Sequence, residues 1–451
     1  MSVFDNERLA HHTFKLDVER MRRGWYSDKY FSNIVGLLIN IAADGYAVEW
    51  SLPEGLGAQL GLSAEAVGDM AVEMQFFPRR SPYAVIVGVD KALAMLKECT
   101  GYFDERDEFV NTYDQLEVEA VHDGFVAEYS GDPSSVTPVI RVRGRYRDFA
   151  MLETPMLGAL TRASRVATNV YETLRAANGK TVLFFPARFD AHEVQAADGY
   201  SYNIAVQLFN QNYAKRAGIS VSTDEQGSWW GGLGGGTIAH AAISVFLGDT
   251  AAVLLAFSHD RPAEIPRVAL VDFHNDCVGD SLSVMQAMFT EYRRCIDAGD
   301  PTTAEKFRLY GVRPDTSSAL RDRSVRPLGD ARLDLGVVPR LVFAMREAID
   351  NAWRGWDLPP EWRERAEQWC REVRIVASGG FEPERIRRFE QLGVPVNVYA
   401  VGSSLFNNCS DDGTKTDFTA DVVRAYVEGE WRGMAKVGRQ PSPNPDLERV
   451  E

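Results

Sequence analysis

VRIVASGGFEPERI (373–386) decides the fold of this chain, because an apolar strand ends in a serine–glycine turn and a helical pattern follows at once. Other apolar runs also end in a small polar or charged cluster: TVLFFPA (181–187), RVALV (267–271), LYGV (309–312) and VNVYAV (396–401). Strands that alternate with helices pair in parallel, and their carboxyl ends meet on one face. We therefore expect one face to collect the basic, acidic and glycine-rich groups that follow these strands.

The alternating pattern covers about residues 151–406 and predicts an α/β domain. A further strand is expected near 251–257, and helices are expected at 149–178, 191–210, 239–249, 278–298, 335–353, 360–371 and 382–392. Strands joined by crossover helices favour a parallel sheet, and both a barrel and an open doubly wound sheet fit this order.

Residues 1–150 show no such regular order, which predicts a separate α+β domain. A polar arm is expected at 1–28 and an extended Pro-rich tail after 437. Between them we expect helices at 29–42 and 90–99, and strands at YAVEW (46–50), MQFF (74–77), YAVIVG (83–88) and within 118–150.

The composition is typical of a globular enzyme, with 45% hydrophobic and 25% charged residues over 451 positions, a length that suits two domains. The formal net charge of −15 argues against general nucleic-acid binding, which needs basic surfaces. The five cysteines are scattered, the first residues lack a secretory pattern, and no apolar run approaches the ~20 residues of a membrane helix. These features predict a cytoplasmic protein without zinc or disulfides.

The polar residues that follow the strands suit an anionic, phosphorylated substrate and a metal ion. Arg313 can bind a carboxylate or phosphate and Asp315 a hydroxyl or a magnesium-bound water, or the two can form a structural ion pair. In VDFHNDC (271–277), Asp272 and Asp276 can bind Mg²⁺, but Asp276 can equally cap the following helix. His274 has no evident role.

Glycine-rich segments provide candidate anion sites. GSWWGGLGGGTIAHA (227–241) places Gly235 and Gly236 before a helix with His240 in its first turn. The alternatives are a flexible surface loop and a packing histidine. The turns Gly379-Gly380 and Gly402-Ser403 each follow an apolar strand, and together they predict a phosphate cradle of backbone N–H groups and serine hydroxyls.

In this order, the segments resemble the nicotinate/nicotinamide phosphoribosyltransferase family over about residues 26–437. The matching pieces are SDKY (27–30), LETPMLGALTRASRVATNV (152–170), FPAR (185–188), GTIAHA (236–241), VDFHND (271–276), GVRPDT (311–316), SGGF (378–381) and YAVGSSLF (399–406). The resemblance implies a homodimer in which an irregular α/β barrel (151–406) is joined to an open-faced α+β sandwich. Residues 1–150 form most of that sandwich, and 407–451 pack on it.

The resemblance also implies an activity in NAD biosynthesis: transfer of phosphoribose from phosphoribosyl pyrophosphate to a pyridine nitrogen, with Mg²⁺ and ATP and without nucleic acid or membrane partners. Each matched residue then has an implied role. Phe185 and the partner subunit's Tyr30 hold the ring, Arg188 and Arg313 meet the pyrophosphate, phosphate or carboxyl group, and Asp315 meets the ribose. The 5′-phosphate is bound by Gly379, Gly380, Gly402 and Ser403. ATP phosphorylates His240, which Asp272 orients.

The identity of the base is inferred from LFNQNYAKR (208–216), which has no acid where nicotinamide-specific members place an aspartate. We therefore expect nicotinate. ARFDAHEVQAADGY (187–200) departs from the family pattern by Asp190, His192 and Glu193. These departures leave open an altered base or a missing ATP step. The alternatives to nicotinate transfer are nicotinamide or another pyridine acid as the base, a non-catalytic nucleotide-binding regulatory homologue, and, without the resemblance, a barrel enzyme that acts on some sugar phosphate.

Overall fold

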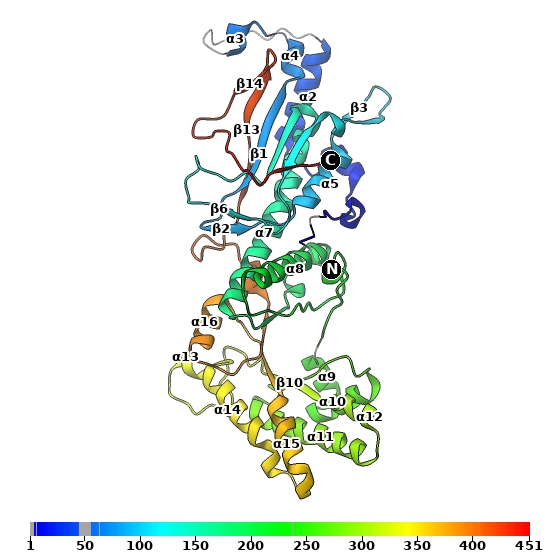
Figure 1. The fold of residues 1–451 in the computed structure, drawn as a ribbon, viewed down its shortest axis with the longest axis vertical. Coiled ribbons are helices and arrows are strands. Elements are labelled where there is room, and N and C mark those ends of the chain that lie inside the picture. Colours follow the sequence, from blue (N-terminus) through cyan, green and yellow to red (C-terminus); the bar gives the residue numbers. More distant parts are fainter. Residues whose placement is uncertain (1–3, 6, 45–55, 63, 237) are drawn as a thin grey trace. The chain divides into compact units, whose positions relative to one another are not determined.

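The computed structural model describes residues 4–5, 7–44, 56–62, 64–236 and 238–451, so the expected strand at 46–50 lies outside the described residues (Figure 1). The chain divides into two units, one formed by 1–168 with 407–451 and the other by 169–406. The division falls within α7 (Glu153–Ala176), later than the predicted boundary at 150. The two large sheets are one antiparallel and one parallel, which confirms the mixed α/β class.

The first unit is built on a six-stranded antiparallel sheet with the order β14-β13-β1-β7-β5-β15. Its strands are β1 (Ala71–Pro78), β5 (Glu117–Ala120), β7 (Ile140–Arg145), β13 (Phe418–Val427), β14 (Glu430–Gly433) and β15 (Glu448–Arg449). Two small antiparallel pairs accompany it: β2 (Tyr83–Val85) with β6 (Val126–Glu128), and β3 (Gly101–Phe103) with β4 (Phe109–Asn111).

The two faces of β1 differ because its side chains alternate. Val72, Met74 and Phe76 join a large apolar core, to which residues of α5 (Val89–Cys99) and α7 also contribute. On the other face Glu73 is fully buried, and its carboxylate accepts from Arg143 at 2.7 Å. Helices therefore cover one face of this sheet, whereas ion pairs occupy the other.

The predicted polar arm at 1–28 is wrong for much of its length. It contains α1 (Val18–Arg22), its residues Phe14 and Met21 are buried, and Arg8 forms a 2.9 Å ion pair with Asp90 of α5. Met21 belongs to the apolar core of this unit, and Leu16 and Val18 pack against that core. The other helices of the unit are α2 (Lys29–Asp44), α3 (Leu56–Leu60), α4 (Ala64–Gly68) and α6 (Tyr146–Phe149).

The second unit contains a five-stranded parallel sheet with the order β8-β12-β11-β10-β9. The strands are β8 (Thr181–Phe184), β9 (Arg267–Leu270), β10 (Leu309–Arg313), β11 (Arg374–Ala377) and β12 (Val398–Val401), all close to the predicted runs. Single parallel bridges from Phe184 to Val221 and from Val221 to Gly234 continue the sheet beyond β8.

One apolar cluster contains side chains from all five strands, including the two outer ones. Its buried members are Leu183, Val268, Val376 and Ala400, and Phe185, Tyr310 and Val398 pack against them. A single cluster on one face indicates a curved sheet. Among the described strands, hydrogen bonds do not close β9 onto β8, so the sheet remains open there.

The helices of the second unit are α8 (Gln195–Asn212), α9 (His240–Val245), α10 (Thr250–Asp260), α11 (Cys277–Asp297), α12 (Pro301–Lys306), α13 (Ala331–Asp334), α14 (Pro339–Asn351), α15 (Pro360–Glu372) and α16 (Pro383–Gln391). The strand predicted near 251–257 is wrong, because α10 occupies it. Asp249 caps this helix by accepting from the Ala252 N–H at 2.9 Å, and alanine and leucine favour the helix.

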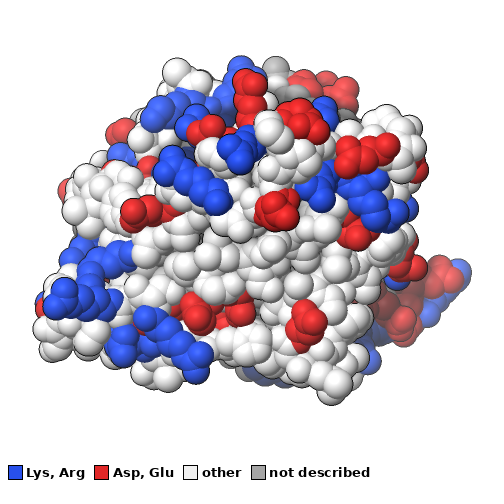
Figure 2. Space-filling view, turned by 90° about the horizontal axis from the view of Figure 1, so that it is seen from below, with Lys and Arg blue, Asp and Glu red and all other residues white. Residues whose placement is uncertain are grey.

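No described helix combines the length and hydropathy needed to cross a membrane. On the face drawn in Figure 2, acidic and basic side chains are interspersed rather than gathered into fields of one sign.

Candidate functional site

The carboxyl ends of the five parallel strands carry most of the residues that the sequence singled out. From β8 across the sheet to β9, the order is Phe185 and Arg188 (after β8), Gly402 and Ser403 (β12), Gly379 and Gly380 (β11), Arg313 and Asp315 (β10) and Asp272 (β9). Parallel strands present these positions along one edge, which is the edge used for chemistry in α/β folds.

Arg313 lies at the end of β10 and is buried, with 5% of its surface exposed. Its Nη1 lies 3.4 Å from Ser378 Oγ and 3.6 Å from Asp315 Oδ2. Its Nη2 donates to the Ile238 carbonyl at 3.2 Å, and its guanidinium carbon lies 5.7 Å from the centre of the Phe185 ring. Arg313 thus joins three strand ends to the segment that precedes α9.

The charge of Arg313 is only partly compensated. Burial lowers the pKa of Arg313, Asp315 and Asp272 oppose the decrease, and the positive charge of Arg188 adds to it. An arginine remains protonated under these conditions. Its Nε–H is buried and has no acceptor among the described residues. Two neighbouring guanidinium groups, one of them with an unpartnered N–H, favour an anion between them.

His240 and Asp272 form a pair at the same edge. His240 is the first residue of α9, and its Nε2 lies 3.1 Å and 3.2 Å from the two carboxylate oxygens of Asp272. Burial raises the pKa of Asp272, whereas His240 opposes the increase and Asp315 adds to it. Because Nε2 faces the carboxylate, Nδ1 is the ring nitrogen left for another reactant.

Two backbone turns lie next to each other at this edge. Gly379 and Gly380 have φ angles of +94° and +70°, a conformation that glycine adopts readily and other residues rarely do. A Cβ added to Gly379 would lie 3.5 Å from Asp315 Oδ1. The Ser404 hydroxyl donates to the Phe381 carbonyl at 2.9 Å and so joins the turn after β12 to the turn after β11.

Phe185 and Arg188 border the second of these turns. The Phe185 N–H donates to the Val401 carbonyl at 3.0 Å, which fixes Phe185 beside β12. Arg188 is exposed, and its guanidinium carbon lies 5.4 Å from the ring centre of Phe189. Phe189 lies against Gly402, since a Cβ added there would be 2.7 Å from its ring. Phe189 therefore forms a wall of the turn, a role that the sequence did not reveal.

Among the solved structures that are similar to this chain are two enzymes of known name. One is nicotinate-nucleotide pyrophosphorylase from Pyrococcus furiosus, with a TM-score of 0.61 and 21% sequence identity over 96% of this chain and 84% of that chain. The other is human nicotinic acid phosphoribosyltransferase, with a TM-score of 0.53 and 17% identity over 90% of this chain and 75% of that chain. The chain has the fold of the type II phosphoribosyltransferases. No protein-family model matches the sequence.

Within this phosphoribosyltransferase fold, some predicted site residues have other partners. Asp276 caps α11 by accepting from the Gly279 N–H at 2.9 Å, as the capping interpretation predicted. His274 pairs with Asp280 through an Nδ1–Oδ1 distance of 2.8 Å. The Gly235 N–H donates to the Val221 carbonyl at 2.8 Å, so the prediction that it meets an anion is wrong.

The stretch 208–216 was expected to lie near the base, and this expectation is also wrong. Soon after it, the Gly218 N–H donates to Thr181 Oγ1 at 3.2 Å, at the first residue of β8. Asn210 near the end of α8 exchanges hydrogen bonds with Ala217 at 2.8 and 3.0 Å, so the end of this helix lies near the amino end of β8, whereas Phe185 follows its carboxyl end. The lack of an acid in 208–216 therefore carries no information about the base.

Tyr30 belongs to the first unit, at the start of α2, and is 58% exposed. Its hydroxyl donates to Asp28 Oδ2 at 3.3 Å, and Asp28 also accepts from Thr154 Oγ1 at 3.1 Å. The role implied for Tyr30, to hold a substrate ring that is bound in the partner subunit, stays a prediction.

The residues at the strand ends fit a magnesium ion that arrives with a phosphate ligand. The described residues hold no group of three or more His, Cys, Asp or Glu side chains arranged for a metal. Asp315 lies close enough to Asp272 for its negative charge to raise the pKa of Asp272. Magnesium is commonly held by one or two carboxylates together with substrate phosphates and water.

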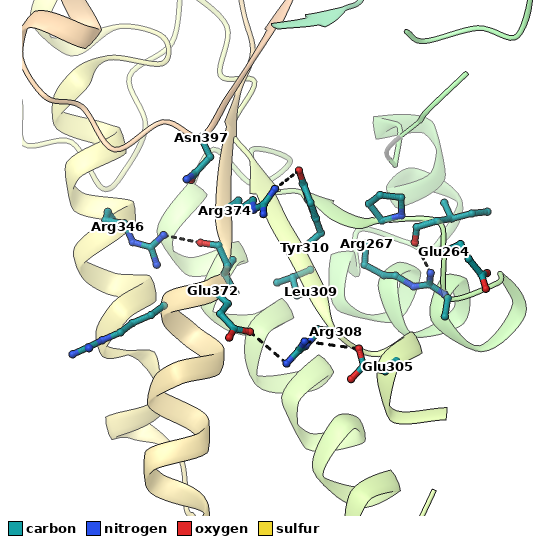
Figure 3. A pocket seen from close by; sticks show the side chains of 15 residues that line it. Glu264, Arg267, Glu305, Arg308, Leu309, Tyr310, Arg346, Glu372, Arg374 and Asn397 are labelled. Carbon is teal, nitrogen blue, oxygen red and sulfur yellow. Dashed lines mark hydrogen bonds and ion pairs between the residues drawn. The ribbon is translucent and has the colours of Figure 1, made fainter. Parts of the chain in front are cut away.

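A cavity of about 630 Å³ lies at the opposite end of the sheet, where Arg267, Leu309 and Arg374 begin β9, β10 and β11 (Figure 3). Its charged side chains are largely paired: Arg308 lies 3.4 Å from Glu372 and 3.9 Å from Glu305. The amino end of a parallel sheet usually serves stability rather than chemistry. The cavity is therefore not the candidate site.

Proposed function

We propose that this protein transfers phosphoribose from phosphoribosyl pyrophosphate to nicotinate, giving nicotinate mononucleotide and pyrophosphate in NAD biosynthesis. The observation that carries the proposal is the buried Arg313, in contact with Asp315 and Ser378, beside the Phe185 ring and near Arg188. This arrangement combines a flat apolar ring with a positive charge that is only partly compensated, which suits a planar ring that bears a carboxylate. The curved parallel sheet would be part of the irregular barrel.

The reaction exchanges one bond at ribose C1. The bond from C1 to the pyrophosphate oxygen breaks and its electron pair leaves with pyrophosphate, while the pyridine nitrogen forms a bond to C1 with its lone pair. No proton is transferred, so positioning and charge stabilisation dominate catalysis. Phe185 would support the ring by stacking, and Asp315 would bind the ribose hydroxyls and stabilise positive charge at C1.

The leaving group needs positive charge, which Arg188 and Arg313 would supply. A bound Mg²⁺ would add charge at the pyrophosphate oxygens, held there by Asp272 or Asp315 and by the substrate. The free N–H groups of the glycine turns after β11 and β12 would bind the 5′-phosphate.

ATP coupling would proceed through His240. Its Nδ1 is the free nitrogen, and Asp272 holds Nε2 and stabilises the positive charge that develops on the ring. The Nδ1 lone pair would attack the γ-phosphorus of ATP and ADP would leave. Hydrolysis of the resulting phosphohistidine by water would release phosphate and make nucleotide formation more favourable.

A homodimer would complete the site. On α2, Tyr30, Ile34 and Leu37 recur at helical spacing and are 58%, 40% and 51% exposed, and Trp25 nearby is 68% exposed. An apolar stripe of this kind favours burial against another subunit. The partner subunit's Tyr30 would then face Phe185 across the pyridine ring.

The test is a pyrophosphate-release assay with phosphoribosyl pyrophosphate, Mg²⁺ and either nicotinate or nicotinamide, each with and without ATP. The proposal predicts release with nicotinate and stimulation by ATP. Release with nicotinamide but not with nicotinate would identify nicotinamide as the base. Absence of release with both bases would contradict the proposed activity.

A further inference from the structure

We infer that Arg385, together with Ser404, is a positioning residue that holds the turn Gly379–Phe381 in the form that binds the substrate's 5′-phosphate. The inference rests on the proposed function for the identity of that phosphate. Neither residue is among those that the resemblance assigns to the site.

Arg385 donates hydrogen bonds to the carbonyl groups of the turn. Its Nη1 donates to the Gly379 carbonyl at 2.7 Å and to the Gly380 carbonyl at 3.0 Å. Its Nη2 donates to the Val337 carbonyl at 2.7 Å, which ties the guanidinium to a segment outside the turn. The guanidinium carbon also lies 4.4 Å from the centre of the Phe381 ring.

These contacts determine where the N–H groups of the turn point. In a trans peptide the carbonyl and the following N–H point in opposite directions. Because the carbonyls of Gly379 and Gly380 face Arg385, the N–H groups of Gly380 and Phe381 face away from it. Neither of these N–H groups has a hydrogen-bond acceptor in the part of the chain that is described. Ser404 holds the third carbonyl, that of Phe381.

A separate observation favours an anion at the same strand end. Ser378 directly precedes the turn and its hydroxyl contacts Arg313, which is 95% buried and has an unpartnered Nε–H. A buried cationic N–H group without a protein acceptor can donate to an anionic ligand or to a water molecule. Two free backbone N–H groups and this guanidinium therefore surround the end of β11, with Arg385 on the opposite side of the turn.

The experiment compares Arg385→Met, Arg385→Lys and Ser404→Ala with Arg387→Met in the full-length protein. Arg387 is the matched control, because it is exposed on α16 and no hydrogen bond or ion pair of its side chain occurs among the described residues. Isothermal titration would give the Kd for ribose 5-phosphate, and steady-state kinetics would give KM separately for phosphoribosyl pyrophosphate and for nicotinate.

Arg385→Met should weaken ribose 5-phosphate binding and raise the KM for phosphoribosyl pyrophosphate by about tenfold or more, because two charge-assisted hydrogen bonds lose their alignment. The KM for nicotinate should change little. Arg385→Lys should recover part of the loss, since its ammonium group keeps a positive charge and N–H donors but cannot span three carbonyl groups as the guanidinium does. Ser404→Ala should show a smaller loss, and Arg387→Met should match the wild type.

Equal Kd values in wild type, Arg385→Met and Ser404→Ala would overturn the inference. A parallel rise in the KM for both substrates would do the same, since it would indicate a general structural role. If Arg385→Met does not fold, Arg385→Lys and Ser404→Ala decide the question. If the wild type turns over no base but binds ribose 5-phosphate in an Arg385-dependent way, the proposed function fails and this inference stands.

Discussion

Replacement of Arg313 by methionine tests the centre of the site, because this residue connects the strand ends and faces the ring of Phe185. An arginine has five N–H bonds. Hydrogen bonds to Ser378 and to the Ile238 carbonyl use two of them, and the ion pair with Asp315 engages Nη1 as well, so about two N–H groups, including the buried Nε–H, remain for a substrate anion. A hydrogen bond to a charged group contributes about 1.5–3 kcal/mol. Removal of both N–H groups should therefore reduce the stabilisation of the transition state by about 3–6 kcal/mol.

That loss corresponds to a decrease of about 10²- to 10⁴-fold in kcat/KM. The assay is steady-state pyrophosphate release with nicotinate and phosphoribosyl pyrophosphate, with thermal unfolding as a check that the variant is folded. Arg374→Met is the matched control, because Arg374 is an exposed arginine at the opposite end of the sheet that bonds to Tyr310 at 2.7 Å. A folded Arg313→Met variant with wild-type kcat/KM would refute the reasoning.

Further predictions concern the histidine pair, a buried carboxyl group and a glycine turn. His240→Gln should abolish the stimulation by ATP and the acid-labile phosphate on the protein; stimulation equal to wild type would remove His240 from the ATP step. Burial, with Asp421 and Asp28 nearby, raises the pKa of Glu153 to about 7 from the ordinary 4.5, so the folded state keeps this proton longer than the unfolded state. The free energy of unfolding should therefore fall as pH rises from about 4.5 to about 7, and Glu153→Gln should gain stability over wild type at pH 8 but not at pH 4.5, as measured by urea unfolding. Gly402→Ala should displace the Phe189 ring and raise the KM for phosphoribosyl pyrophosphate about fivefold, whereas Gly355→Ala, where a Cβ meets nothing within 4 Å, should not.

The strand ends could be predicted from the sequence because the signal is local. An apolar run followed by Ser378-Gly379-Gly380 or by Arg313-Pro-Asp315 marks both the strand and the edge where it ends. The strand expected at 251–257 failed because an apolar run of this length carries no period that separates a buried strand from a helix. The cap at Asp249 was the signal that could have corrected it.

Contacts that depend on the path of distant segments could not be predicted. The Gly235 N–H is taken by Val221, and the carbonyls of Gly379 and Gly380 are held by Arg385, because tertiary packing brings these groups together. The same limit explains the error at 208–216, since only the folded chain shows that α8 ends beside the first residue of β8. The types of residue in a site are local information, whereas their partners are not.

The most direct test of the account is identification of the reaction product by mass spectrometry, with isotopically labelled nicotinate, phosphoribosyl pyrophosphate, Mg²⁺ and ATP. The account predicts labelled nicotinate mononucleotide in amounts equal to the pyrophosphate released, and a large loss of both with Arg313→Met. Pyrophosphate without labelled nucleotide, or labelled nucleotide formed equally well by Arg313→Met, would contradict it.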